Sequence, residues 1–181
     1  MRQDARENRE RILAAAEDVF GTRGAAGSTE EVAQRAGVGI ATVFRHFPTK
    51  DALIESALLR HYERLGERAR ALADHPDPAE AWRALVRALI ETGATKLTLA
   101  ATLSDRTQTP AAAMRAAKHL KTAVGDFLHR AQAAGAVRES VTIDEVYLLI
   151  RALAQACATA PTPPDTRDRA ITIVLDGLAL P

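Results

Sequence analysis

The chain has 181 residues and a mass of 19.4 kDa, which suffices for one or two small domains with a hydrophobic core. It is 47% hydrophobic but only 4% aromatic and rich in alanine, a composition that favours an all-α fold. The net charge of +1 excludes a protein that is basic as a whole, so any nucleic-acid interface must be local.

Cysteine use and hydropathy indicate where the protein works. The single cysteine, Cys157, excludes an internal disulfide and is typical of a reducing compartment. No apolar run approaches the roughly 18 residues of a membrane span. The N-terminal sequence MRQDARENRER is charged and lacks the apolar core of a signal peptide. We therefore expect a cytoplasmic protein.

The chain begins with a polar arm, residues 1–5, followed by a predicted helix over residues 6–22. Apolar side chains recur along this helix at the spacing of one buried face: Ile12, Leu13, Ala16, Val19 and Phe20. The loop that follows is rich in glycine. The next segment, residues 28–50, has the clearest pattern of helix caps and turn residues in the sequence.

Two short helices are predicted in residues 28–50, and they meet at Gly37. Ser28 and Glu31 form a capping box that starts the first helix. Gly37 follows it, where a helix C-terminus favours a residue that tolerates positive φ. The second helix spans residues 40–46. This arrangement is a helix-turn-helix, whose second helix can lie in the major groove of DNA.

The second helix has an apolar side and a polar side. Val43 and Phe47, with Val32 and Val38, are expected to pack the interior of a three-helix domain. On the other side, Arg45 can pair with a guanine or a phosphate, and nearby methyl groups can contact thymine methyls. The residues that face the groove are expected to be Gly39, Ile40, Ala41, Thr42, Arg45 and His46.

Many residues of this region follow one order and spacing: Arg11-Ile12-Leu13, Ala15-Ala16, Phe20, Gly24, Thr29, Ala36-Gly37-Val38, Thr42, Phe44, His46, Phe47 and Lys50. In these residues the chain resembles the tetracycline-repressor (TetR) family of transcriptional regulators. The resemblance covers roughly the first 55 residues. It implies phosphate contacts from Thr29, Thr42, His46 and Lys50. It also implies one from a tyrosine hydroxyl, but this chain has Phe44 at that position, and phenylalanine has no hydroxyl.

Five further helices are predicted downstream. A long one ends near residue 74, before the turn His75-Pro76-Asp77-Pro78, and carries a solvated face that includes Arg60. Asp77 caps the next helix, whose apolar stripe reaches residue 97. After a polar break at residues 104–108, a helix covers residues 109–134, with room for a short helix before it. The last two cover residues 142–158 and 166–177.

The resemblance implies that the last two long helices pair with a second copy as a four-helix bundle. The apolar excess of these helices agrees with an interface. The residues expected there are Tyr147, Ile150, Leu153, Cys157, Ile171, Val174, Leu175 and Leu178. An effector pocket is expected among the helices that end near residues 74, 97, 134 and 158, with apolar walls and a few polar groups. Its candidates are Tyr62, Trp82, Leu89, Thr92, Lys96, Met114, Arg115 and Phe127.

The sequence therefore predicts an all-α protein with an N-terminal three-helix DNA-binding domain, residues 1–50, and a C-terminal helical ligand-binding and dimerisation bundle, residues 51–181. The implied function is a ligand-responsive regulator, more often a repressor, that binds a palindromic DNA operator as a homodimer. No catalytic constellation, metal cluster or cofactor motif is visible; Asp126 and His129 give one isolated D-x-x-H. Two alternatives stay open. In one, the N-terminal domain binds proteins and not DNA; in the other, the chain is a ligand-binding or catalytic bundle with a vestigial DNA-binding domain.

Overall fold

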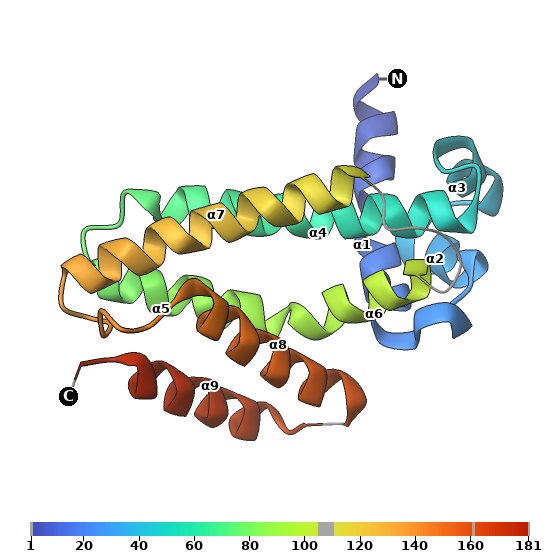
Figure 1. Ribbon diagram of the computed structural model, residues 1–181. Helices are drawn as coiled ribbons and strands as arrows, with labels where there is room; N and C mark the ends of the chain where they lie inside the picture. Colours follow the sequence, from blue (N-terminus) through green and yellow to red (C-terminus); the bar gives the residue numbers. More distant parts are fainter. Residues whose placement is uncertain (1, 105–110, 161, 181) are drawn as a thin grey trace. The chain divides into compact units, whose positions relative to one another are not determined.

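The computed structural model describes residues 2–104, 111–160 and 162–180, and within these ranges every long regular element is an α-helix. This confirms the all-α prediction. Figure 1 follows the helices in chain order: α1 (Arg2–Arg23), the 3-10 turn η1 (Gly24–Ala26), α2 (Thr29–Ala36), α3 (Ile40–His46), α4 (Lys50–Ala73), α5 (Pro78–Glu91), α6 (Gly93–Ser104), α7 (Ala111–Ala133), α8 (Ile143–Thr159) and α9 (Pro164–Leu178). None of these helices is long and apolar enough to cross a membrane.

Capping residues that the sequence contains set several of these boundaries. The Asp77 carboxylate accepts hydrogen bonds from the backbone N–H groups of Ala79 and Glu80, at 2.8 and 3.2 Å, and begins α5. Thr142 and Glu145 form a reciprocal capping box at the start of α8. The predicted caps of these two helices are therefore confirmed.

Two helix boundaries differ from the prediction. The N-terminal arm is helical from Arg2 onward. The helix expected to continue to residue 97 ends at Glu91, and α6 begins two residues later. At this end, the carbonyl of Ala88 accepts hydrogen bonds from both the backbone N–H and the hydroxyl of Thr92, at 3.2 and 2.8 Å. The predicted break at residues 105–108 and the helix start at Thr109 lie outside the described residues.

The short side chain at the start of α6 has a packing reason. A Cβ atom at Gly93 would lie only 2.6 Å from the Cβ of Ala154 in α8. Only glycine lets the two helices approach this closely. The need for glycine at this position therefore comes from a residue some sixty positions further along the chain, which helical periodicity does not reveal.

The chain forms two compact units that interleave along the sequence. The first comprises Met1–Tyr62 and Thr95–Ala116, and the second comprises Glu63–Ala94 and Ala117–Pro181. In the first unit, Leu99 and Leu103 of α6 join the apolar core formed by α1 to α4. The compact units thus do not follow the chain order of the predicted division at residue 50, and the division into functional domains stays a prediction.

The second unit has its own core, where α5 contacts α8 and α9. Each helix contributes apolar side chains at helical spacing: Trp82, Leu85 and Val86 from α5, Leu120, Val124 and Leu128 from α7, Val146 and Ile150 from α8, and Ile171 and Leu175 from α9. Burial of these residues inside one chain removes them from the surface that could meet a second copy.

Candidate nucleic-acid interface

The helix-turn-helix forms as its sequence predicts. The Ser28 hydroxyl accepts a hydrogen bond from the Glu31 backbone N–H, and the Glu31 carboxylate accepts one from the Ser28 N–H. At the other end of α2, Gly37 has φ +66° and ψ +37°, the left-handed conformation that favours glycine. The Val38 N–H then donates to the carbonyl of Ala33 at 3.0 Å and closes the turn.

Helix α3 has one buried and one exposed face. Val43 and Phe47, like Val32 of α2, are almost fully buried, and Val38 packs against the same core, which confirms their predicted structural role. On the opposite face Ile40 is 37% and Phe44 43% exposed. Gly39, Ala41 and Arg45 are exposed as well, and Thr42 is partly exposed. Ile40 and Phe44 therefore add apolar surface beside the polar groups of this face.

The charge on this face is a single guanidinium. In the described part of the chain, no acidic side chain pairs with Arg45, so its donors are available to a ligand. A second basic side chain, Arg9 of α1, lies 5.5 Å above the ring of Phe47 at the C-terminal end of α3. Sequence reasoning missed Arg9, because its position beside α3 follows from the packing of α1 and not from the motif.

Three predicted phosphate ligands are less open than expected. Thr29 is buried and its hydroxyl lies 3.3 Å from the Glu30 carboxylate, so a direct contact between that hydroxyl and phosphate does not fit the structure. His46 is half-buried, and its Nε2 atom is enclosed without a hydrogen-bond partner among the described residues. Lys50 donates to two backbone carbonyls of the loop before α2.

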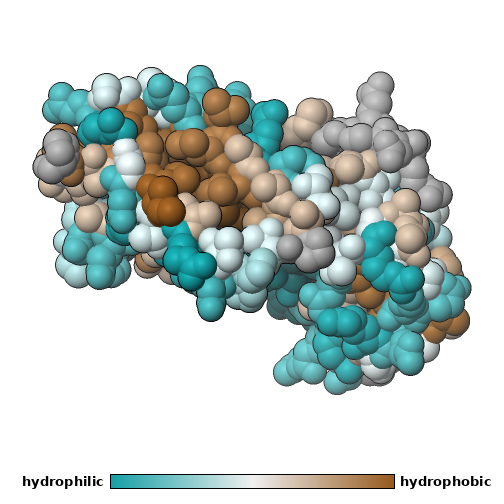
Figure 2. All heavy atoms as spheres, turned by 90° about the horizontal axis from the view of Figure 1, so that it is seen from below, coloured by the Kyte–Doolittle hydropathy of each residue, from teal (hydrophilic) through white to brown (hydrophobic). Residues whose placement is uncertain are grey.

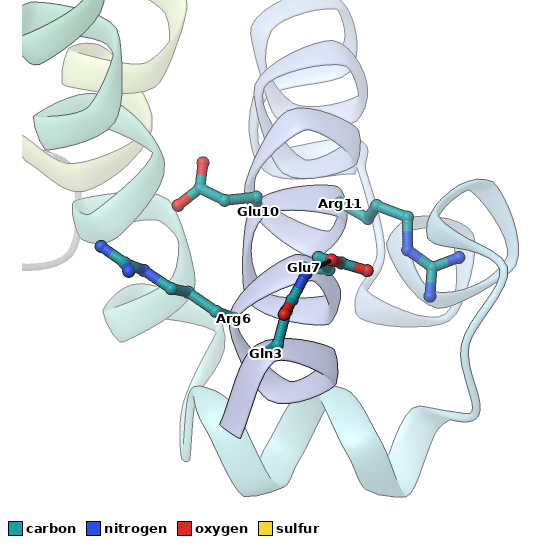
Figure 3. Close-up of a pocket in the computed structure, with 5 residues that line it drawn as sticks. All are labelled: Gln3, Arg6, Glu7, Glu10 and Arg11. Carbon is teal, nitrogen blue, oxygen red and sulfur yellow. Dashed lines mark hydrogen bonds between the residues drawn. The ribbon is translucent and has the colours of Figure 1, made fainter. Parts of the chain in front are cut away.

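The N-terminal turns of α1 line an open hollow, shown in Figure 3. Arg6 and Glu10 point to one side of the helix, and Arg11 points to the other. The Arg11 guanidinium donates to Asn8. Because the residues around the hollow are all polar or charged and it is open to solvent, it lacks the enclosure of a small-molecule pocket.

The comparisons with known proteins match both ends of the chain. A family model described as bacterial regulatory proteins of the tetR family matches residues 12–57. A second model, described as the C-terminal domain of SbtR-like transcriptional regulators, matches residues 77–180. The chain belongs to the TetR family of transcriptional regulators. It is therefore a DNA-binding regulator, and the tetR model covers the whole helix-turn-helix.

Solved structures of TetR regulators agree along nearly the whole chain. The regulator SCO0520 from Streptomyces coelicolor is 31% identical, with a TM-score of 0.77 over 94% of this chain and 98% of that one. A TetR regulator from Mycobacterium vanbaalenii is also 31% identical, with a TM-score of 0.78 over 99% of both chains. The ketosteroid regulator KstR2 of Mycobacterium tuberculosis, at 22% identity and a TM-score of 0.68, shares the fold. No curated protein matches the sequence.

The residues predicted for a TetR effector pocket fall into both compact units. Trp82, Leu89 and Phe127 are buried in the second unit, and Thr92 there is partly buried. Tyr62 and Lys96, which are partly buried, belong to the first unit. Burial raises the pKa of the Tyr62 hydroxyl. Met114 and Arg115 have exposed side chains on α7, and the pocket that would include them stays a prediction.

The residues predicted for the dimer interface also divide. Ile150, Ile171, Leu175 and Leu178 are buried inside the chain itself, so their assignment to a surface that meets a second copy is wrong. The reason is that α5 takes up this face of α8 and α9. Tyr147, Leu153, Cys157 and Val174 are partly exposed. The large apolar side chains left open on these helices are instead Leu148, at 66%, and Ile173, at 70%.

Figure 2 shows apolar side chains gathered over a broad area of the second unit. Leu148 of α8, Ile173 of α9 and Leu180 after it are the large exposed hydrophobic residues of this part of the chain. Ala152 and Ala156 of α8 are exposed beside them in sequence register, one and two turns after Leu148. We call these five residues the α8–α9 apolar face.

A charged cluster inside the first unit was not foreseen. Arg60 of α4 donates to the carboxylates of Glu10, at 3.0 Å, and Glu17, both on α1. Glu17 and His61 are buried, with 3.8 Å between the His61 Nδ1 and a Glu17 oxygen. Burial lowers the pKa of Arg60, but the hydrogen bonds to Glu17 and Glu10 outweigh it and raise the pKa. The predicted solvated role of Arg60 is therefore wrong: it ties α4 to α1.

Proposed function

We propose that the chain is a ligand-responsive repressor that binds a palindromic operator as a homodimer. The observation that carries the proposal is the exposed face of α3, where an unpaired guanidinium, Arg45, lies on the same side of the helix as the open side chains of Ala41 and Phe44. An arginine can fork onto guanine O6 and N7 or grip a phosphate, and small apolar groups can contact the methyl group of thymine. The proposed contacts are Gly39, Ile40, Ala41, Thr42, Phe44, Arg45 and His46.

The α8–α9 apolar face supports the homodimer. Exposed isoleucine and leucine side chains on adjacent helices lose contact with water when a second copy covers them. A two-fold axis brings the same face of both copies together, as in most soluble dimers. With two recognition helices related by that axis, the operator is expected to be palindromic, with half-sites about 34–36 Å apart or a multiple of that distance.

Buried groups of the second unit support a site for a small effector. The indole N–H of Trp82 is buried with no acceptor among the described residues, and a polar atom of a ligand would satisfy it. Leu89 and Phe127 are apolar and buried in the same unit. We propose an effector that is apolar or modestly polar. It can release the operator only if it binds one conformation more tightly than the other, and a coupling of about 1–3 kcal/mol is typical.

The proposal has further consequences for the whole chain. Residues 1–50 are assigned to DNA binding and residues 51–181 to effector binding and dimerisation, in a cytoplasmic regulator without turnover of its ligand. The only tryptophan of the sequence is Trp82, so its fluorescence reports directly on effector binding. Screening small molecules for a change in that fluorescence, with Trp82→Phe as the blank, tests the effector site.

The first experiment is selection of binding sites from random duplex DNA by the purified chain, at two salt concentrations. We expect a palindromic consensus whose binding weakens with salt. If Arg45 contacts a base, Arg45→Ala should relax the consensus at one position. If Arg45 contacts a phosphate, the variant should lower the slope of log K against log salt by about 0.9 in magnitude. Arg68→Ala is the matched control, because Arg68 is also an exposed arginine but belongs to α4 and not to the helix-turn-helix.

Each outcome of this selection has a distinct meaning. Salt-dependent binding without a consensus would refute base reading by α3. Equal effects of Arg45→Ala and Arg68→Ala would refute the assigned face. No binding at either salt concentration would favour the alternative function, a ligand-binding bundle with a vestigial DNA-binding domain, over the proposed repressor.

A further inference from the structure

Lys50, the first residue of α4, makes contacts that differ from those implied for it. Its ammonium donates to the backbone carbonyls of Ala25, at 2.9 Å, and Gly27, at 2.5 Å. The same nitrogen lies 5.2 Å from the centre of the Phe20 ring. An ammonium has three N–H donors, so two of them are used inside the protein, and the cation also faces an aromatic ring.

The two carbonyls belong to a helix end. Ala25 lies within η1, and Gly27 is the residue that ends it. Carbonyls at the end of a helical turn have no partner in that turn and need one from elsewhere. Charge-assisted hydrogen bonds from an ammonium are stronger than bonds between neutral groups. Lys50 therefore fixes this loop by satisfying groups that would otherwise need water.

The position of the contact in the chain gives it a wider effect. Gly27 directly precedes Ser28, the N-cap of α2, and Lys50 directly follows Thr49, so the contact joins residues 23 positions apart. The whole helix-turn-helix lies between them. The ammonium thus closes that segment at its base and holds the beginning of α2 close to the beginning of α4.

We infer that Lys50 is a positioning residue of the DNA-binding site, and that it sets the orientation of α2 and α3 without contacting phosphate itself. This inference rests on the proposed DNA-binding face of α3. Two of the three ammonium donors are used by these carbonyls and the cation lies above Phe20, so a phosphate would have to compete with contacts that already hold the side chain inside the protein. Phosphate is instead contacted by groups that the clamp of Lys50, Ala25 and Gly27 holds in place.

The test compares Lys50→Met with Lys50→Arg and with Arg45→Ala. Methionine keeps an unbranched apolar stem over Phe20 but has no donor or charge. Arginine keeps a charge and enough N–H groups for both carbonyls. The probe is the duplex that the wild-type chain enriches from a random library. Affinity is measured over a series of salt concentrations, at a temperature at which circular dichroism shows every variant to be folded.

A phosphate ligand and a positioning residue predict different results. If Lys50 positions the helices, Lys50→Met binds about tenfold more weakly with an unchanged salt dependence. Peptides that cover residues 24–31 then exchange their amide hydrogens faster. Lys50→Arg restores both affinity and protection. If Lys50 binds phosphate, the salt dependence of Lys50→Met falls by about 0.9 and hydrogen exchange does not change; this would overturn the inference.

The control separates this inference from the proposed function. If Arg45→Ala weakens binding and Lys50→Met also shows a reduced salt dependence, the positioning role is refuted but the proposed DNA-binding face is not. Wild-type chain that binds no duplex refutes the proposed DNA-binding face and the positioning role with it. Unchanged affinity in Lys50→Met, with faster exchange at residues 24–31, would show that the clamp stabilises the loop but does not position the recognition helix, and this also overturns the inference.

Discussion

Replacing Ile173 tests the proposed dimer at its most exposed apolar side chain. Ile173 lies on α9 and is 70% exposed, whereas Leu175, two residues further on, is 2% exposed. The two positions differ little in distance along the helix but face opposite environments. A change at Ile173 should therefore affect association, and a change at Leu175 should affect folding.

The expected magnitude follows from the exposed area. Complete burial of an isoleucine side chain is worth about 1.5–3 kcal/mol, so covering the exposed part of Ile173 contributes about 1–2 kcal/mol per copy. A two-fold interface contains the residue twice, which gives about 2–4 kcal/mol for the dimer. Ile173→Ala should therefore raise the dimer Kd by about 30- to 900-fold. Ile173→Asp should raise it further, because the carboxylate also loses water.

The assay is sedimentation over a series of protein concentrations, with circular dichroism to confirm folding. Ile173→Ala should dissociate at concentrations at which the wild type is dimeric, while its helix content stays unchanged. Leu175→Ala, the control, should lose about 2–5 kcal/mol of unfolding free energy through a buried cavity. A dimer Kd that neither Ile173→Asp nor Leu148→Asp alters, or a wild type that stays monomeric, would refute the assignment of the α8–α9 apolar face.

Three further predictions concern charge and hydroxyl groups. Arg60→Met should cost about 2–3 kcal/mol in urea unfolding, because buried Glu17 loses its guanidinium partner; a loss below 0.5 kcal/mol, the scale of a surface pair, would contradict this. The backbone and hydroxyl of Thr142 hold the pKa of Glu145 below its ordinary value, so this cap stabilises the protein above the unfolded pKa and is lost as pH falls through the folded one. A nuclear magnetic resonance titration should show the low pKa, and Thr142→Val, which keeps the backbone N–H but removes the hydroxyl, should raise it part of the way; an equal pKa in both chains would refute the contribution of the hydroxyl. Phe44→Tyr should tighten operator binding about 3- to 10-fold without changing its salt dependence, since a neutral hydroxyl adds a hydrogen bond but no charge; weaker binding would show that Phe44 itself contacts a base.

The local sequence was sufficient to predict the helix-turn-helix. Its signals act over a few residues: Ser28 and Glu31 satisfy each other's backbone groups, and Gly37 adopts the positive φ that the turn needs. Val43 and Phe47 recur at the spacing of one helix face. No contact from a distant segment is needed to specify such features, so α3 begins at Ile40 and ends at His46, as the pattern predicts.

Features that depend on distant contacts were decided only by the tertiary structure. Periodicity shows that α9 has apolar residues, but it does not show that α5 covers Leu175 and leaves Ile173 open. The motif places Lys50 near DNA, yet only the folded chain brings its ammonium to the carbonyls of Ala25 and Gly27. The sequence by itself determined the helices, the turn and the family, because short-range capping and periodicity encode them. Packing decided which face of each helix remains exposed, because burial depends on which distant residue occupies the other side.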